Sequence, residues 1–521
     1  MYFLARGGFS GRQKRPVKLA AAAATTAAVI TLALSVVSHV SSQPAAPLGG
    51  VANVRDFHAA GDGATDDTAA IKQALAAALR VKGTVYFPPG TYLISETLTV
   101  TDTVAFAGSG WGSILVLKDG IRRIMILVQG SSPSGETLGF QASNLVLDGN
   151  RGGQLDAGLL QINSAVGFVV DHLWIRNAGR PGESRSQGVA GISVAVKSLA
   201  TTVASRGVIT NSLIEATTKP GVVWSTHATD GLVSGNVIRG LRGNSLTPCL
   251  AVSEGKNVSL TGNSVSECEG AGISIANGGH NVAPLHVIVA NNHVYANGTG
   301  AVEGNGIQVV NAFPDRNAFV EIIGNVVYEN RGASDGYGIM VQNVDHAVVN
   351  GNIVRHNKRS GIVLYNVRGA LVTSNYVFGN NTLGTPEHSG IMLHQVNNVH
   401  LTGNLVFDDG PAPTQAYGLF FSGTQASDRL SVTNNVLYPN KRGPWQGHVP
   451  PTNTVFVANR MSNDTSLAVE TTNPGSVLEI TPRVSRPAQP TSIGDAPPGR
   501  PTSFLHVKHG GKAYRIPLYD E

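Results

Sequence analysis

The stretch YGIMVQNVDHAVVNGNIVRHN at residues 337–357, followed by GIVLYNVRGALVTSN at residues 361–375, contains one pattern twice. In each copy a Gly-Ile pair opens a short apolar run that ends in Asn, and a second apolar run ends in Gly-Asn or Ser-Asn. The same two half-motifs recur from about residue 191 to residue 459, with the closing asparagines 23 to 33 residues apart. Self-similarity at this period indicates a repeat architecture rather than an ordinary globular domain.

The runs between these punctuating residues predict β-strands. Each run is four to six residues long, rich in β-branched side chains and bounded by Gly and Asn, which leaves no room for a helix. Side chains alternate along a strand, so Ile362 and Leu364 face one side while Val363 and Tyr365 face the other. Short strands joined by short turns, with one face aliphatic throughout, predict a parallel β-solenoid of about ten to twelve coils.

The asparagines at the ends of the runs have a structural explanation. Asn tolerates the left-handed backbone of a sharp corner, and its amide can bond to an equivalent residue in the next coil, about 4.8 Å away. We therefore interpret two rows of these residues as structural ladders rather than catalytic groups. One row closes the first strand of successive coils at Asn277, Asn311, Asn343, Asn366 and Gln395, and the other comprises Asn211, Asn236, Asn263, Asn292, Asn325, Asn352, Asn375, Asn404, Asn435 and Asn459.

The composition fits such a coil and argues against one class of partner. Glycine is frequent, with 62 residues, and charged residues make up only 14% of the chain, as many tight corners around an aliphatic interior require. The formal net charge of +5 includes five basic residues within the first 18, so the rest of the chain is close to neutral. We therefore expect no nucleic-acid partner.

The first 42 residues read as a targeting segment. A basic stretch precedes an uncharged run at residues 19–40, as in a secretory signal peptide or an uncleaved signal anchor. Small residues at 40–42 favour cleavage. We expect a secreted or cell-envelope protein that contacts a membrane only through this segment, if the segment is retained.

The two cysteines, Cys249 and Cys268, are 19 residues apart and fall in adjacent predicted coils. An exported chain permits a disulfide between them, and two buried thiols stacked in the core are the alternative. Nothing in their spacing indicates a metal site.

Residues 51–100 differ from the repeats. A strand leads to a Gly-Asp-Gly turn at residues 61–63, and a helix is predicted to open at Asp66 or Asp67 and to end at Gly83. An apolar stripe containing Ile71 and Leu75 would plug the open end of the coil stack. We interpret the two aspartates as a helix start, where negative side chains are favoured, rather than as a catalytic pair.

Two motifs in this segment carry a family resemblance. The pattern DF-x-A-x-GDG-x-TDDT-x-AI at residues 56–71 and GTVYFPPGTY at residues 83–92 resemble the opening of pectate-lyase superfamily proteins, also described as rhamnogalacturonase- or epimerase-like. LVLDGNR at residues 145–151 is similar to a stretch of the mannuronan epimerases. The resemblance implies a right-handed parallel β-helix and a polysaccharide substrate.

The sequence lacks the catalytic motifs of those relatives. The Asp-Pro-His signature of the epimerases is absent, since the nearest stretch, residues 224–227, lacks the acid. The polygalacturonase set of paired Asp, Gly-His-Gly and Arg-x-Lys is missing too, and His58 stands where Gly is usual. The resemblance therefore suggests the fold and the substrate class and leaves the reaction open.

Equivalent positions in successive coils can be aligned by counting from the Gly of each Gly-Ile pair. Three residues before that Gly the chain has, in five consecutive coils, Glu269, Glu303, Asp335, Lys358 and Glu387. Stacked carboxylates repel one another unless they are splayed into water, bridged by a cation such as Ca²⁺, or paired with a basic residue. Glu269, Glu303 and Asp335 are therefore candidate metal ligands, and the sequence indicates no other cofactor.

The outward side of the same strands gives two further columns. Four residues after the Gly come Ala276, Val310, Gln342, Tyr365, His394 and Ser422; two residues after it come Ser274, Gln308, Met340, Val363, Met392 and Phe420. Tyr365 and His394 should then lie one coil apart, with His388 on the turn before the strand of His394. Gln308, Gln342 and His388 are candidate substrate-binding residues.

These columns suit chemistry on a uronate polymer. A lyase or C5-epimerase must neutralise the uronate carboxylate, remove the C5 proton, and protonate C5 or the leaving oxygen. Lys358 or Arg359 suits the first task and Tyr365 and His394 the proton transfers, while Asp335 or Glu387 completes the candidate catalytic set. The alternatives are a non-catalytic glycan-binding or envelope scaffold protein and a glycoside hydrolase using a carboxylate pair such as Asp335 with Glu303.

The predicted organisation therefore has five parts. They are a targeting segment at 1–42, an N-terminal segment with a capping helix at 51–100, β-helix repeats at 101–470, a Pro-rich linker at 482–503 and a C-terminal β-hairpin at 504–521.

Overall fold

The computed structural model describes residues 50–130, 137–153, 157–163, 165–180, 188–195, 206–225, 228–241, 247–276, 285–300, 304–311, 318–461, 468–471, 479–481, 503–509 and 512–518. The predicted targeting segment lies outside these residues, as does the predicted linker except for its last residue. No helix among the described residues is long and apolar enough to cross a membrane.

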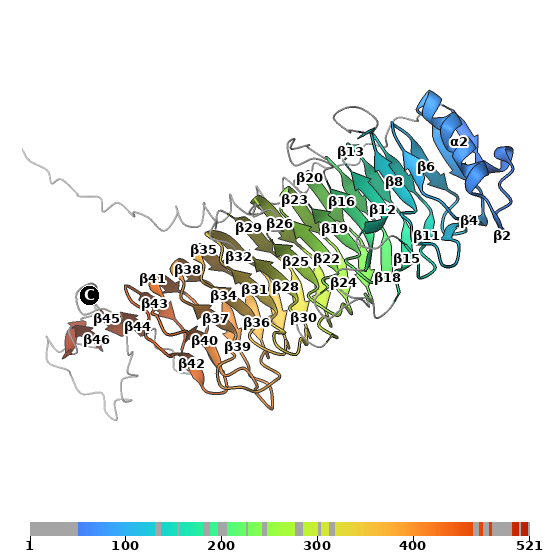
Figure 1. Ribbon diagram of the computed structural model, residues 1–521. Coiled ribbons are helices and arrows are strands. Elements are labelled where there is room, and N and C mark those ends of the chain that lie inside the picture. Colours follow the sequence, from blue (N-terminus) through green and yellow to red (C-terminus); the bar gives the residue numbers. More distant parts are fainter. Residues whose placement is uncertain are drawn as a thin grey trace, which may run out of the picture. The chain divides into compact units, whose positions relative to one another are not determined.

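The repeats form a right-handed parallel β-helix, as predicted, whose coils follow one another from the blue to the orange part of the ribbon in Figure 1. Within the described residues it has three sheets, sheet A with 16 strands and sheets B and C with 13 each. The prediction of ten to twelve coils was slightly low, because the first coils lack the Gly-Ile and Asn motifs from which coils were counted.

Sheet A receives one strand from almost every coil, and only its last strand, β44, runs antiparallel to its neighbour. Its strands are β1 (Val51–Asn53), β3 (Thr84–Phe87), β6 (Ala105–Gly108), β10 (Gln141–Ser143), β14 (Val169–Asp171), β17 (Val208–Thr210), β20 (Thr229–Ser234), β23 (Lys256–Thr261), β26 (Leu285–Ala290), β29 (Phe319–Ile323), β32 (His346–Asn350), β35 (Arg368–Thr373), β38 (Asn397–Thr402), β41 (Asp428–Thr433), β43 (Val455–Asn459) and β44 (Ala468–Thr471).

Sheet B follows sheet A in each coil after a one- to three-residue corner in most coils. Its strands are β2 (Asp62–Asp66), β4 (Gly90–Ile94), β7 (Ser113–Leu117), β11 (Val146–Asp148), β15 (Trp174–Ala178), β18 (Leu213–Thr217), β21 (Val237–Arg239), β24 (Ser264–Ser266), β27 (His293–Tyr295), β30 (Val326–Tyr328), β33 (Ile353–Arg355), β36 (Tyr376–Phe378) and β39 (Leu405–Phe407).

Sheet C contains the strands that the Gly-Ile motif opens. They are β5 (Leu98–Val100), β8 (Ile126–Gln129), β12 (Ala157–Asn163), β16 (Val189–Ala195), β19 (Val222–Ser225), β22 (Leu250–Ser253), β25 (Ile273–Ala276), β28 (Ile307–Val310), β31 (Ile339–Gln342), β34 (Ile362–Tyr365), β37 (Ile391–His394), β40 (Tyr417–Ser422) and β42 (Gly443–Gly447).

The remaining elements are short or terminal. β9 (Thr137–Leu138) pairs with β13 (Ala165–Val166), and the 3-10 helix η1 (Val54–Phe57) precedes the helix α2 (Thr68–Val81). β45 (Glu479–Thr481), β46 (Ser503–His509) and β47 (Lys512–Leu518) form an antiparallel sheet where the sequence predicts the terminal hairpin.

The strand register confirms the predicted outward columns of sheet C. Gln342 is the partner of Tyr365 and Tyr365 is the partner of His394 in adjacent strands. On the inward side, Ile362 and Leu364 are fully buried in one core cluster that also contains Ile71 and Leu75 of α2. The alternation of apolar residues along each strand therefore determines which side chains fill the coil and which line its surface.

The long asparagine ladder is confirmed from Asn236 to Asn459. Each buried side-chain amide donates to the Oδ1 of the next coil's asparagine, at 3.0 Å from Asn236 to Asn263 and at 2.9 Å from Asn352 to Asn375. The prediction for Asn211 is wrong: this residue is exposed, and the backbone N–H of Ser212 takes the ladder position by donating to Asn236 Oδ1.

A second amide ladder, not predicted, follows sheet B. It joins Asn297, Asn330, Asn357, Asn380 and Gln415.

In the predicted ladder at the end of sheet C, Asn343 and Asn366 adopt the left-handed backbone and are joined by a 2.8 Å hydrogen bond. Gln395 has the same backbone conformation, with φ of 51°, which confirms its equivalence to the asparagines. Asn277 lies outside the described residues.

The helix start departs in detail from the prediction. Asp67 occupies the N-cap position, yet its carboxylate accepts the backbone N–H groups of Ala60 (2.5 Å) and Gly61 (3.0 Å) instead of capping α2. Asp66 accepts the N–H of Thr68 at 3.2 Å. Both acids therefore fix the N-terminal segment on the first coil, in agreement with their structural interpretation.

Cys249 and Cys268 are joined by a disulfide, with their Cα atoms 5.6 Å apart. This resolves the alternative that the sequence left open. The bond links two adjacent coils on the N-terminal side of the cavity described next.

Candidate active site

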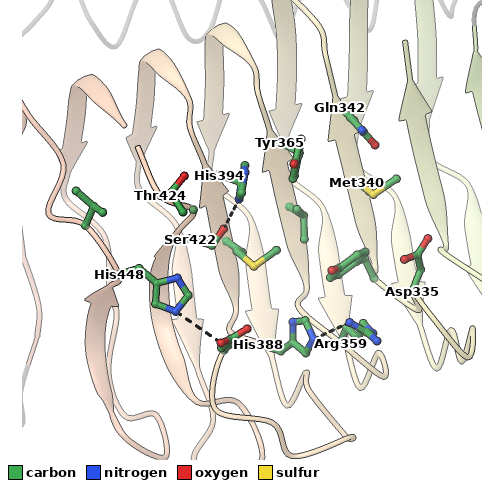
Figure 2. A pocket seen from close by; sticks show the side chains of 16 residues that line it. Asp335, Met340, Gln342, Arg359, Tyr365, His388, His394, Ser422, Thr424 and His448 are labelled. Carbon is green, nitrogen blue, oxygen red and sulfur yellow. Dashed lines mark hydrogen bonds and ion pairs between the residues drawn. The ribbon is translucent and has the colours of Figure 1, made fainter. Parts of the chain in front are cut away.

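A cavity of about 890 Å³ lies on the outward side of sheet C, over β31, β34, β37 and β40 (Figure 2). It brings together seven of the predicted site residues from turns and strands up to 59 positions apart. They are Asp335, Gln342, Arg359, Tyr365, Glu387, His388 and His394.

The floor of the cavity is apolar. Met340, Val363, Met392 and Phe420 occupy the second outward column and form a cluster separate from the core, each at most 9% exposed. They pack on one another and against Tyr337 and Tyr417, and this column is equally buried in earlier coils, as at Ser274. This floor offers a dry surface between two rows of polar groups.

The first polar row lies at the ends of the strands and contains Gln342, Tyr365, His394 and Ser422. The rings of Tyr365 and His394 are stacked, with centroids 4.0 Å apart and planes 6° from parallel. The Nδ1 of His394 lies 3.0 Å from the hydroxyl oxygen of Ser422 (Figure 2). Parallel strands thus place a phenol and an imidazole side by side at the coil spacing.

His394 is suited to proton transfer. Burial, with a smaller contribution from nearby His448, lowers the pKa of His394. The ring is therefore neutral at pH 7. Within the described part of the chain its Nε2 has no hydrogen-bond partner, so this nitrogen can accept a proton when Nδ1–H donates to Ser422, or donate one when Ser422 donates to Nδ1.

The second polar row lies on the turns that precede the strands. The Nη1 of Arg359 donates to the Nε2 of His388 at 3.0 Å. Arginine is always a donor, so this contact requires the His388 proton to be on Nδ1, which lies 3.4 Å from the hydroxyl of Ser360. Burial and the Arg359 charge lower the pKa of His388 to about 4. His388 is therefore a neutral acceptor that positions Arg359.

Arg359 keeps an unused donor. Its guanidinium carbon lies 6.0 Å from the ring centre of Tyr337, and among the described residues its buried Nε has no hydrogen-bond partner. An unsatisfied buried donor is unfavourable in the free protein. Because Arg359 carries a permanent positive charge and lines the cavity, it is the group best placed to bind an anion there.

Two carboxylates flank the arginine in different environments. Burial raises the pKa of Asp335, although Arg359 and the Asn305 side chain offset part of that effect. Glu387 is more exposed, and its Oε1 lies 3.6 Å from Nε2 of His448. The two acids therefore differ in their surroundings, Asp335 half-buried beside Arg359 and Glu387 exposed beside His448.

Two predicted residues do not belong to this cavity. Lys358 lines another cavity, of about 470 Å³, at the turns between sheets B and C. Lys358 and Arg359 lie in a bend between β33 and β34, and the bend directs Arg359 toward sheet C and Lys358 away from it. Gln308 continues the column of Met340 but is buried, bonded to Asn305 and Ser274, and does not line the cavity.

The predicted cation site remains a prediction. Glu303 lies outside the described residues, and those described contain no group of three or more His, Cys, Asp or Glu placed to hold a metal ion.

Sequence reasoning missed two contributors. Tyr337 packs edge-on against His388 at 5.7 Å, and its position next to Gly338 was the available signal. His448 follows β42, the last strand of sheet C, which has no Gly-Ile motif, so no repeat pattern could have placed it.

Two protein-family models match the chain. The model for rhamnogalacturonase A/epimerase, pectate lyase-like proteins matches residues 51–351. The model for the periplasmic copper-binding protein NosD matches residues 311–482.

Individual relatives match shorter stretches. The chain is 44% identical over 115 residues to mannuronan C5-epimerase AlgE6 of Azotobacter vinelandii, covering 20% of this chain and 13% of the relative. It is 37% identical over 108 residues to alginate lyase 7 of the same organism, covering 19% of this chain and 13% of the relative. The chain thus matches only about one eighth of the length of each.

Among solved structures, the A-module of Azotobacter vinelandii mannuronan C5-epimerase AlgE4 superposes with a TM-score of 0.53 and 18% identity. The superposition covers 78% of this chain and 100% of that module. At this identity the likeness concerns the fold alone.

Proposed function

The chain belongs to the rhamnogalacturonase A/epimerase, pectate lyase-like family, and from that premise we propose that it is an exported enzyme acting on an acidic, uronate-containing polysaccharide. The proposed reaction is β-elimination or C5-epimerisation. Matches to a mannuronan C5-epimerase and an alginate lyase support the substrate class. The basic and apolar leader at residues 1–42 supports an extracytoplasmic location.

One observation carries the proposal. An arginine with an unused donor and a stacked Tyr-His pair face one cavity across an apolar floor. Both uronate reactions need a fixed cation for the carboxylate and two proton-transfer groups near C5. The apolar floor suits the C–H face of a sugar ring lying between the two rows.

In the proposed mechanism Arg359 binds the uronate carboxylate and stabilises the negative charge that spreads onto it when the C5–H bond breaks. His388 positions that guanidinium and keeps its own proton on Nδ1. The Nε2 of His394 accepts the C5 proton, while the hydroxyl of Ser422 accepts the Nδ1–H of His394. Each step uses a group whose environment suits it, because both imidazoles are held neutral.

Tyr365 supplies the second proton. In β-elimination the electron pair of the broken C5–H bond forms a C4–C5 double bond, the C4–O bond breaks, and the phenol protonates the leaving oxygen. Epimerisation needs a proton delivered to C5 from the opposite face, and two rings stacked in one row lie on the same side of the sugar, so this pair favours elimination. Elimination leaves His394 protonated and Tyr365 deprotonated, and proton exchange with water or between the stacked rings restores both.

The test is an assay of the full chain on alginate, pectate and neutral glycans, with absorbance to detect unsaturated ends and NMR to detect C5 inversion. We expect turnover on at least one uronate polymer and none on neutral glycans. Absence of turnover on every polymer, with binding kept by His394→Ala, would instead support the non-catalytic glycan-binding alternative.

A glycoside hydrolase is the second candidate, favoured by one observation. Asp335 and Glu387 line the same cavity two coils apart, about 10 Å along the solenoid, which is near the upper end for an inverting carboxylate pair. The raised pKa of Asp335 suits a general acid. Release of reducing ends without unsaturated products would favour this reaction.

A further inference from the structure

The outward side of sheet B carries a row of rings that the proposed chemistry does not use. One residue per coil contributes to it, and the register pairs each with the next. The row consists of Tyr295, Tyr328, Arg355, Phe378 and Phe407. We call this row, with the parallel column that includes Ile353, Tyr376 and Leu405, the aromatic platform.

The members of the row are in contact. Tyr295 and Tyr328 are stacked with centroids 5.2 Å apart and planes 6° from parallel. The guanidinium carbon of Arg355 lies 4.2 Å from the ring centre of Tyr328, and Phe378 stacks on Phe407 at 5.9 Å. Since the strands β27 to β39 are consecutive in sheet B (Figure 1), the platform is about 19 Å long.

The outer column of the platform is exposed, whereas the rings of Tyr295, Tyr328, Phe378 and Phe407 are half-buried beside it. Ile353 and Tyr376 are each 39% exposed and Leu405 is 42% exposed, forming a contiguous apolar column. Earlier in sheet B the positions of the ring row are charged, as shown by the ion pair between Arg239 and Glu215 at 3.1 Å, although the column beside them already carries Leu213 and Val237. A contiguous apolar patch on an otherwise polar surface marks a binding face.

The edge of the platform is basic. The turns after β30 and β33 place Arg331 and Lys358 in the cavity of about 470 Å³, together with one acid, Glu329. Glu329 is paired with Arg331 at 3.2 Å. Among the described residues Lys358 forms no ion pair, and Arg355 lies on the platform itself. Three cations against one carboxylate give this edge a net positive charge.

We propose that the aromatic platform and its basic edge form a second binding surface for an acidic polysaccharide. The apolar faces of the sugar rings lie on the exposed side chains, and their carboxylates lie toward Lys358 and Arg331. Exposed rings beside cations suit a flat ligand with apolar faces and negative charges at its edge. This inference rests on the proposed function for the class of polymer, although its test does not depend on turnover.

The turn that carries Lys358 and Arg359 connects the two surfaces. These adjacent residues line the platform-side cavity and the candidate active site, respectively. One polymer chain can therefore lie on the platform and cross this turn to reach the sheet C cavity, so the platform would hold a part of the chain remote from the reacting sugar.

The experiment measures binding of oligouronates and of neutral oligosaccharides of equal length to the full chain by calorimetry. Three variants are compared: Tyr376→Ala, Lys358→Gln and the cavity double variant Arg359→Met/His394→Ala. Leu371→Ala serves as the matched control, because Leu371 is 46% exposed on sheet A, away from both surfaces. Thermal melts verify that each variant is folded, and Lys358→Gln leaves every ring in place.

We expect Tyr376→Ala and Lys358→Gln each to weaken oligouronate binding at least about fivefold, while the cavity variant retains a binding phase that either substitution, added to it, weakens by the same factor. Added salt should weaken that phase. Equal loss for neutral and acidic sugars, unchanged binding in both platform variants, or a concentration-dependent dimer that Tyr376→Ala abolishes would each overturn the proposal. Failure of the proposed reaction would leave this binding phase intact.

Discussion

The two ends of sheet C have the same interior and different surfaces. From β12 to β28 the outward columns carry small or neutral residues such as Ser193, Ala251 and Ser274, whereas from β31 to β40 they carry Met340, Tyr365 and His394. The inward residues are apolar in both halves, mostly aliphatic with Trp224 in one and Phe421 in the other, and most are fully buried. The coil thus repeats its core and confines chemistry to a few outward positions, so stability and function can be altered separately.

The largest effect on turnover is expected in the outward column of sheet C that contains His394. Replacing His394 by Ala should reduce turnover of the uronate polymer about a thousandfold, because the group placed to accept the C5 proton is lost. Steady-state kinetics on that polymer is the measurement. Ser253→Ala, which alters the same outward column three coils before Gln342, should leave turnover and stability unchanged. Equal losses in both variants would contradict the division between the two halves.

The next effect concerns the buried asparagine ladder, which runs through successive coils of the β-helix. Asn352→Ala removes four hydrogen bonds of the buried ladder, two donated by its amide and two accepted by its Oδ1. It should lower the free energy of unfolding by about 3 kcal/mol, as judged from urea unfolding. The matched control is Asn211→Ala outside the ladder, which removes one exposed hydrogen bond and places Ala at a φ of 50°, so it should cost only about 1 kcal/mol.

A smaller effect is expected from the arginine. Arg359→Met should lower kcat/KM on the uronate polymer about a hundredfold, since the carboxylate loses its cation. It should also raise the pKa of His388 above about 4, because the positive charge that opposes protonation is gone while burial remains. NMR titration of the imidazole measures the second change. An unchanged His388 pKa would show that the arginine does not act on that ring; Arg239→Met provides the control.

The smallest effect is a pH dependence of stability. His388 has a folded pKa of about 4, below its ordinary value near 6.5, so the unfolded chain binds the proton more readily. The contribution of His388 to the free energy of unfolding is present above pH 6.5 and is lost as pH falls toward 4. The loss is about 2 kcal/mol between pH 7 and pH 5. Urea unfolding of wild type and His388→Gln at both pH values isolates this term. If wild type and His388→Gln lost the same stability between pH 7 and pH 5, the loss would come from groups other than His388.

Much of the site could be predicted because a solenoid converts sequence spacing into spatial position. Counting from Gly361 and Gly390 placed Tyr365 beside His394, and the structure confirms that stacking. The same counting failed for Lys358, because the residues before the Gly lie in turns, where the regular alternation of a strand does not apply. It also failed for Asn211, which occupies the left-handed corner position held by Gly235 in the next coil, so that Ser212 takes the ladder position.

The sequence by itself determined the β-helix, its coil register, its corner ladders and the family, since each depends on short-range periodicity that every coil repeats. Only the tertiary structure decided that Arg359 faces the cavity while Lys358 faces the aromatic platform, that His388 is a neutral partner of Arg359, and that His448 reaches Glu387. Those arrangements depend on turns of unequal length rising around an apolar floor, and burial by such turns sets charge states in a way that no local pattern specifies.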